Sequence, residues 1–300
     1  MTTLHPDSRG GPIGMFDSGF GGLTVARAVI DLLGQEDLVY IGDTGRYPYG
    51  DKPQADVRAY ARELAWSLVR DHGAKAVVVA CNTAAAALPV RDLQAEFSAA
   101  GLRVPVIGVI EPGAQSLVRA TKTGTVGVIG TIGTIGSGAY STAVAHAAVG
   151  ARVTLVSASC PGFVEFVERG RTTGDEITVL AERLLAPIKA AGVDALLLGC
   201  THYPFLARVI SEVMGKSVTL VSSADETAFA LRDRLQQAAM LRPGGAGPGR
   251  HLFLSSGDVA WFRDLGSRLL GPELLEAGSW QLSTSTADFL AASRSSASVP

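Results

Sequence analysis

Two short apolar runs of this 300-residue chain share one layout, and each ends in a cysteine. The first starts at Gly73 and ends at Cys81, which Asn and Thr follow, and the second starts at Gly192 and ends at Cys200, which Thr and His follow. Short apolar runs bounded by glycine predict buried β-strands. In open α/β sheets, ligands bind beyond the carboxyl ends of the strands. The layout therefore predicts two strand ends that each present a thiol to a ligand, although buried structural cysteines are the alternative.

Strands and helices are predicted to alternate along the chain, which is typical of parallel sheets covered by helices. The expected strands are 12–16, 37–41, 76–80, 104–109, 125–129, 152–157, 195–198, 218–222, 251–255 and, as an edge strand, 280–282. The expected helices are 23–33, 54–72, 83–100, 163–169, 175–191, 225–241 and 259–270, with one more beginning at Ala139.

The order of strand, Gly/Ser/Thr-rich loop, helix and a later strand ending in Cys occurs twice, which we interpret as an ancient duplication. The expected fold class is therefore α/β, with two pseudosymmetric parallel-sheet α/β domains and the active site at their interface. The first domain is expected to be discontinuous, comprising 1–108 and 222–300, and the second to comprise 109–221. A loose leader over residues 1–11, a surface loop over 242–250 and a disordered Ser/Ala-rich end from about Ala291 complete the prediction.

Composition excludes several classes of partner and site. A net charge of -2 with 18% charged residues indicates neither nucleic acid nor an anionic membrane as a partner. Three cysteines do not make a disulfide framework, and the first residues lack the features of a signal peptide. No apolar stretch is long enough to span a bilayer. We therefore expect a cytoplasmic protein with reduced thiols.

Two further strand ends carry candidate binding residues. The turn after the first strand contains Asp17 and Ser18 and then Gly-Phe-Gly-Gly, a spacing that fits a dinucleotide fingerprint poorly. Its backbone N–H groups, at the start of a helix, can instead bind a carboxylate. The loop after the second strand, 43–50, is rich in turn-forming residues, and a surface turn capped by Asp43 is its simpler interpretation.

The sharpest short motif is Cys-Thr-His-Tyr-Pro at 200–204. A histidine two residues beyond a cysteine can hydrogen-bond the thiol or a substrate and favour the thiolate. Zinc is the competing use of Cys and His, but no second closely spaced ligand pair is present, so a metal is not expected. A Cys–His hydrolase with a nucleophilic thiol remains open, although it leaves Cys81 without a role.

Together the motifs resemble those of the glutamate racemases of the aspartate/glutamate racemase superfamily. The resemblance runs from about residue 12 to 270 and rests on the segments 16–23, 42–50, 80–83, 127–131 and 198–204. It implies a cofactor-independent racemase that supplies D-glutamate for peptidoglycan synthesis. It also implies glutamate as the substrate, two α/β domains around it, and a homodimer.

The resemblance also implies a role for each matching residue. Cys81 and Cys200 correspond to the two catalytic cysteines, the former acting on D-glutamate and the latter on L-glutamate. Asp17 would assist Cys81, and His202 would assist Cys200. The implied substrate contacts are Asp17, Ser18, Tyr49, Gly50, Asn82, Thr83, Thr201 and His202. Glu168 matches an acidic residue near His202, with a solvated helix face as its alternative interpretation, and Cys160 is expected to be structural.

Two thiols suit racemisation because the Cα proton must leave from one face and a proton must return on the other. A thiolate can take the proton while the opposing thiol donates one, and their roles reverse for the other enantiomer. The chemistry of these residues alone does not identify glutamate as the substrate. Aspartate or hydantoin racemisation, a single-Cys hydrolase or decarboxylase, and a non-enzymatic amino-acid-binding module all stay open at this point.

Overall fold

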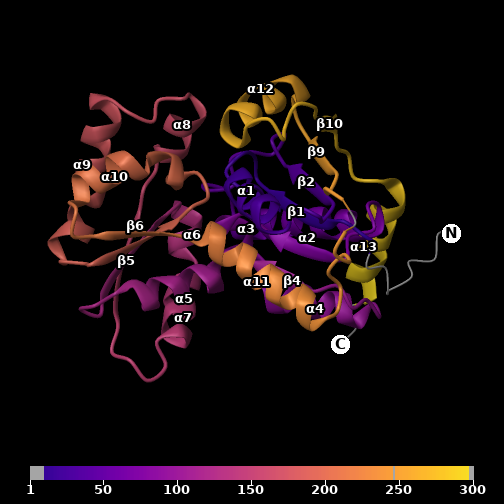
Figure 1. The fold of residues 1–300 in the computed structure, drawn as a ribbon, viewed down its shortest axis with the longest axis horizontal. Coiled ribbons are helices and arrows are strands. Elements are labelled where there is room, and N and C mark those ends of the chain that lie inside the picture. Colours follow the sequence, from indigo (N-terminus) through magenta and orange to yellow (C-terminus); the bar gives the residue numbers. More distant parts are fainter. Residues whose placement is uncertain (1–9, 246, 297–300) are drawn as a thin grey trace.

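The computed structural model describes residues 10–245 and 247–296, which form two lobes that each contain a parallel β-sheet (Figure 1). The six-stranded sheet has the order β10-β9-β2-β1-β3-β4, and the four-stranded sheet has the order β6-β5-β7-β8. The strands of the first are β1 (Ile13–Asp17), β2 (Leu38–Gly42), β3 (Ala76–Val79), β4 (Val106–Gly108), β9 (His251–Ser255) and β10 (Gly278–Ser279). Those of the second are β5 (Thr125–Gly130), β6 (Thr154–Ser159), β7 (Ala195–Gly199) and β8 (Thr219–Ser222).

The two sheets repeat one topology. Across the sheets, the neighbouring strands β2-β1-β3-β4 correspond one for one to β6-β5-β7-β8, and every described strand pair is parallel. The predicted α/β class with two pseudosymmetric parallel sheets is therefore confirmed. Beyond β2 the first sheet is extended by β9 and β10, so the chain returns to it after completing the second. The proposed domain boundaries at 108/109 and 221/222 are compatible with this return and stay a prediction.

The helices of the first half are α1 (Leu23–Leu32), α2 (Gln54–Arg70), α3 (Asn82–Ala87), α4 (Val90–Ala99), α5 (Ile110–Ala120), α6 (Ile132–Gly136) and α7 (Ala139–Ala147). Those that follow are α8 (Phe163–Glu168), α9 (Asp175–Ala190), a 3₁₀ turn (Tyr203–Leu206), α10 (Ala207–Met214), α11 (Ser223–Gln237), α12 (Val259–Leu270) and α13 (Thr284–Ser296). Helix α11 packs against both α1 and α5 and so crosses from one lobe to the other (Figure 1).

The predicted strands from 12–16 to 251–255 match the structure to within two residues at each end, but the helix expected over 83–100 is wrong. It is two helices, α3 and α4, that are separated at Leu88 and Pro89. Leu88 has a ψ of 88°, outside the helical region, because the ring of a following proline disfavours that region. This break ends α3 after six residues. Cys81 is the N-cap of this short helix.

The C-terminal region also differs from the prediction. The edge strand is at Gly278–Ser279 rather than 280–282, and the indole of Trp280 is buried. Helix α13 continues through residues 291–296, which were expected to be disordered, because Phe289 anchors it against Trp66 of α2 at 4.6 Å between ring centroids. The remaining predicted loose ends, 1–9 and 297–300, lie outside the described residues. Helices α5 and α10 were not predicted, and part of the Gly-rich loop after β5 forms α6.

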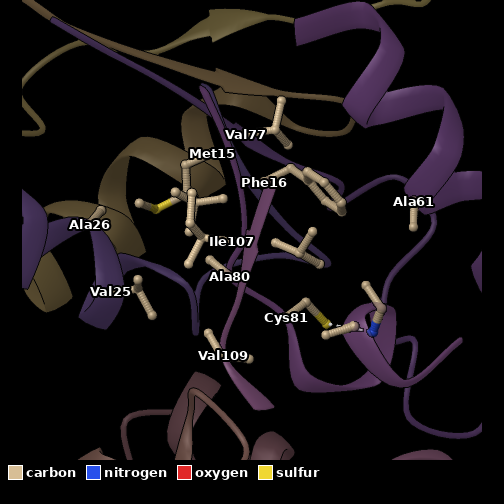
Figure 2. Close-up of a cluster of buried hydrophobic side chains, with 14 of the residues drawn as sticks. Met15, Phe16, Val25, Ala26, Ala61, Val77, Ala80, Cys81, Ile107 and Val109 are labelled. Carbon is tan, nitrogen blue, oxygen red and sulfur yellow. Dashed lines mark hydrogen bonds between the residues drawn. The ribbon is translucent and has the colours of Figure 1, made fainter. Parts of the chain in front are cut away.

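The core of the first lobe extends up to the thiol of Cys81. Strands β1 and β3 are buried along their whole length, as expected for parallel strands covered on both faces. Figure 2 shows Cys81 at the edge of the cluster formed around Met15, Phe16 and Val77. The rigid end of β3 therefore fixes the position of this cysteine. Among the described helices, none has the combined length and apolarity that crossing a membrane requires.

Candidate active site

A cavity of about 550 Å³, open mouth included, lies where the carboxyl ends of the two sheets face each other. Its walls come from the segments that follow β1, β2 and β3 in one lobe and β5, β6 and β7 in the other. Ten of the eleven predicted site residues line it: Asp17, Ser18, Tyr49, Gly50, Cys81, Asn82, Thr83, Cys200, Thr201 and His202. Glu168 does not line the cavity, but its carboxylate contacts the ring of His202.

Cys81 caps the N-terminus of α3. Its Sγ accepts a hydrogen bond from the backbone N–H of Ala84 at 3.4 Å, and its thiol donates to Ser18 Oγ at 3.7 Å. Burial, followed by the neighbouring Asp17 carboxyl, raises the pKa of Cys81 well above its ordinary value. The structure therefore favours a protonated Cys81 in the unliganded site.

Asp17, the last residue of β1, is completely buried beside Cys81. Its Oδ2 accepts the N–H of Gly19 at 3.0 Å, while Oδ1 has no hydrogen-bond partner within the described residues. Burial raises the pKa of Asp17, and the charge of His202 partly opposes that rise. An acid with a raised pKa and a free oxygen can exchange protons with an adjacent group.

The second thiol is connected to a buried His–Glu pair. Sγ of Cys200 lies 3.9 Å from Nδ1 of His202, whose Nε2 lies 3.1 Å from Oε1 of Glu168. Burial by itself would lower the pKa of His202, but the hydrogen bonds to Cys200 and Glu168 outweigh it and raise that pKa to about 10. A protonated imidazole has two N–H donors, one for each of these neighbours. The interpretation of Glu168 as part of a merely solvated helix face is wrong, because its side chain is only 9% exposed.

The two lobes approach each other closely at Gly21, in the turn before α1. A β-carbon at this position would lie 2.4 Å from both His202 Nδ1 and Thr201 Oγ1. Thr24, one turn later, donates its hydroxyl to the carbonyl of Thr201 at 3.3 Å. The absence of a side chain at Gly21 therefore allows the two lobes to come into contact, while a β-carbon at Gly22 would lie 2.6 Å from that of Asp17 within the first lobe, so neither glycine needs a nucleotide to explain it.

The loop after β2 is held by hydrogen bonds to a buried carboxylate rather than lying free on the surface. Asp43 is completely buried and accepts hydrogen bonds from Tyr49 and, at 2.7 Å, from Nε of Arg46. Ser256, in the segment that returns to this sheet, donates to the other carboxylate oxygen at 2.6 Å. The interpretation as an exposed turn capped by Asp43 is wrong. These bonds hold Tyr49 and Gly50 against the cavity.

Several cavity residues were not predicted. Thr131 bonds to Thr83 between the lobes at 3.0 Å, and two signals could have indicated it, its place directly after β5 and its membership of the family-matching segment 127–131. The other unpredicted lining residues lie in loops or at the beginnings of helices: Tyr47, Pro48, Asp51, Ile132, Cys160, Pro161, Gly162, Val164, Glu165 and Tyr203. The lining includes no Lys or Arg. Across the described ranges, no three His, Cys, Asp or Glu side chains form a group that could hold a metal ion.

We expect Gly21→Ala to destabilise the protein, because its new β-carbon would force Thr201 and His202 away from the first lobe. Overpacking of this kind costs about 1–3 kcal/mol in the free energy of unfolding, which urea titration followed by circular dichroism would measure. Gly244→Ala is the matched control, since its β-carbon meets nothing within 4 Å. Equal stability of the two variants would contradict the close contact.

We expect Glu168→Gln to lower the pKa of His202 from about 10 towards its ordinary value of 6.5, because the substitution removes a charged acceptor. A raised folded-state pKa stabilises the fold fully below pH 6.5, and that contribution is lost as the pH rises through 10. The free energy of unfolding should thus fall over this window, and fall less in the variant. NMR titration of the imidazole gives the direct test, and a wild-type pKa near 6.5 would refute it.

Comparison with known proteins gives a consistent result. Residues 23–231 match the family described as Asp/Glu/Hydantoin racemase. Over 265 residues the chain is 51% identical to a glutamate racemase of Parafrankia sp., covering 88% of this chain and 92% of that protein.

Solved structures agree with the sequence relatives. A glutamate racemase from Bacillus anthracis superposes with a TM-score of 0.81 at 36% identity, covering 93% of this chain and 99% of that one. One from Francisella tularensis, in complex with D-glutamate, gives a TM-score of 0.82 at 31% identity, covering 92% and 99%. With two matching parallel sheets and this degree of identity, the chain belongs to the glutamate racemases, a family of amino-acid isomerases.

Proposed function

We propose that this protein interconverts L- and D-glutamate by a cofactor-independent, two-base proton transfer between Cys81 and Cys200. The observation that carries the proposal is that these two thiols follow corresponding strands, β3 and β7, and line one cavity from opposite lobes. Glutamate as the substrate is supported by the D-glutamate bound to the Francisella tularensis relative.

The chemistry around each thiol suits one half of the reaction. In the L to D direction, a thiolate at Cys200 takes the Cα proton and the thiol of Cys81 returns a proton to the opposite face. In the D to L direction the roles reverse. Asp17 acts with Cys81, and His202, oriented by Glu168, acts with Cys200. The raised pKa of Cys81 keeps that thiol protonated and ready to donate.

The cavity lining has no Lys or Arg, so recognition of a substrate with two carboxylates relies on neutral donors together with the protonated His202. Ser18, Thr83 and Thr201 offer hydroxyls, and Asn82 offers a buried amide nitrogen that has no hydrogen-bond partner within the described part of the chain. The segment of Tyr49 and Gly50 adds a further wall. Fixed donors of this kind also stabilise the negative charge that develops when the Cα proton leaves.

The supply of D-glutamate to peptidoglycan, a homodimeric assembly and a cytoplasmic location are the wider parts of the proposal. They rest on the resemblance to the family and stay predictions.

Incubation of the purified protein with L-glutamate in D₂O, without added cofactor, tests the reaction. We expect the optical rotation to decay to zero while deuterium replaces the Cα proton in the NMR spectrum. A covalent acyl adduct or net loss of glutamate would instead indicate a hydrolase or decarboxylase. Racemisation of aspartate or a hydantoin, with glutamate unchanged, would overturn the assigned substrate, and binding without exchange would overturn the enzyme.

Replacement of either proposed base should abolish most of the activity. For Cys81→Ser and for Cys200→Ser we expect kcat to fall by about 10²–10⁴-fold, the usual contribution of a positioned acid or base, measured by circular dichroism of glutamate. Cys160→Ser is the chemically matched comparison, because Cys160 also lines the cavity but has no part in the proposed proton transfer, and it should lose less than about tenfold. Full activity in either of the first two variants would exclude the two-base scheme.

A further inference from the structure

Tyr140 connects the two cysteine-bearing segments without lining the cavity itself. It lies on α7 of the second lobe and is 2% exposed. Its hydroxyl reaches into the first lobe and donates a hydrogen bond to Oδ1 of Asn82, the residue after Cys81, at 2.5 Å. Its ring packs on the residue before Cys200, since a β-carbon added to Gly199 would lie 2.9 Å from Cε2 of Tyr140.

The contact fixes which way the Asn82 amide faces. Burial raises the pKa of Tyr140, so the phenol stays protonated and can donate its proton to Oδ1. The opposite end of the amide, Nδ2, is buried and has no hydrogen-bond partner among the described residues. Because Asn82 lines the cavity and Tyr140 does not, the amide offers its donor end to a ligand.

That orientation matters for an acidic ligand. If the amide rotated, its carbonyl oxygen would face the cavity and repel a carboxylate there. The lining has no Lys or Arg to offset that repulsion, and its protonated His202 is already paired with Glu168. Asn82 directly follows Cys81, whose thiol must approach Cα in the proposed reaction. The carboxylate attached to Cα is therefore within reach of Nδ2, and its negative charge grows as the proton leaves.

A neighbouring helix of the second lobe also contacts Thr83, the residue after Asn82. Thr134, in α6, lies 3.2 Å from the hydroxyl of Thr83. The bend between α6 and α7 thus holds two consecutive residues of the first lobe, Asn82 through Tyr140 and Thr83 through Thr134. Contacts between the lobes, rather than either sheet alone, set the donors beside Cys81.

We propose that Tyr140 is a positioning residue for racemisation, which keeps the Asn82 amide donor directed at the Cα carboxylate of the substrate. This inference rests on the proposed function, since it concerns the same site. It adds a residue outside the cavity whose effect on the reaction passes through Asn82.

Tyr140→Phe tests the inference because it removes the hydroxyl and keeps the ring against Gly199. We expect kcat/KM for glutamate to fall by about 10–100-fold, the effect of releasing one buried hydrogen-bonded group. Tyr60→Phe is the control, since Tyr60 is a half-buried tyrosine that does not line the cavity. Its kcat/KM should stay within about twofold of wild type.

A double-mutant cycle separates positioning from a general structural role. If Tyr140 acts through Asn82, Tyr140→Phe in an Asn82→Ala background should reduce kcat/KM by less than about twofold further. A second loss as large as the first would show that the hydroxyl acts independently of the amide and would overturn the inference. Wild-type kcat/KM in Tyr140→Phe alone would overturn it as well.

The wild-type protein separates the two proposals. If it does not racemise glutamate, the proposed function fails and this inference fails with it. If wild type racemises glutamate and Tyr140→Phe does so equally well, only the inference fails.

Discussion

The parallel direction of all strands within each sheet is the constraint on which the site depends. Parallel strands require a crossover after each strand, so every loop that leaves a carboxyl end lies at the same edge of its sheet. Two such edges facing each other bring Asp17, Cys81 and Cys200 to one cavity. How closely the edges approach then depends on side-chain size, and Gly21, which has no side chain, lies where a β-carbon would meet Thr201 and His202.

Corresponding positions of the two sheets carry opposite chemistry. Cys81 has a buried carboxylic acid as its neighbour, whereas Cys200 has an imidazole backed by a carboxylate. The first arrangement favours a neutral pair, and the second favours a protonated histidine. A duplicated backbone thus places two thiols in unlike surroundings, one beside a buried carboxyl and the other beside a histidine.

Local sequence patterns predicted the strand ends well because their signals are short-range. Apolar runs ending in Cys81 and Cys200 need only local burial to be recognised, and the His202 motif is contiguous. Helix 83–100 failed because Pro89 interrupts an otherwise helical pattern. The prediction of disorder from about Ala291 was wrong for a different reason, since α13 is stabilised by the packing of Phe289 on α2, which composition does not reveal.

Contacts between the lobes were beyond any sequence pattern. Tyr140 and Asn82 are separated by 58 positions, and Thr83 and Thr134 by 51, so no local periodicity relates them. Glu168 was found through the family resemblance, although its pairing with His202 depends on how α8 folds back over the 3₁₀ turn. Contacts across an interface are determined by the tertiary arrangement, and local secondary-structure propensity does not predict them.

Because the chain returns to the first sheet only near its end, the two sheets can complete their strand pairing at different times during synthesis. All four strands of the second sheet come from one continuous stretch, 125–222, and can pair as soon as that stretch has left the ribosome. Strand β2 instead waits for β9, whose first residue His251 pairs with Leu38. Such long-range pairing slows folding because a large loop must close first. During synthesis, therefore, the lobe that carries Cys200 can mature while the lobe that carries Cys81 still has an open sheet edge.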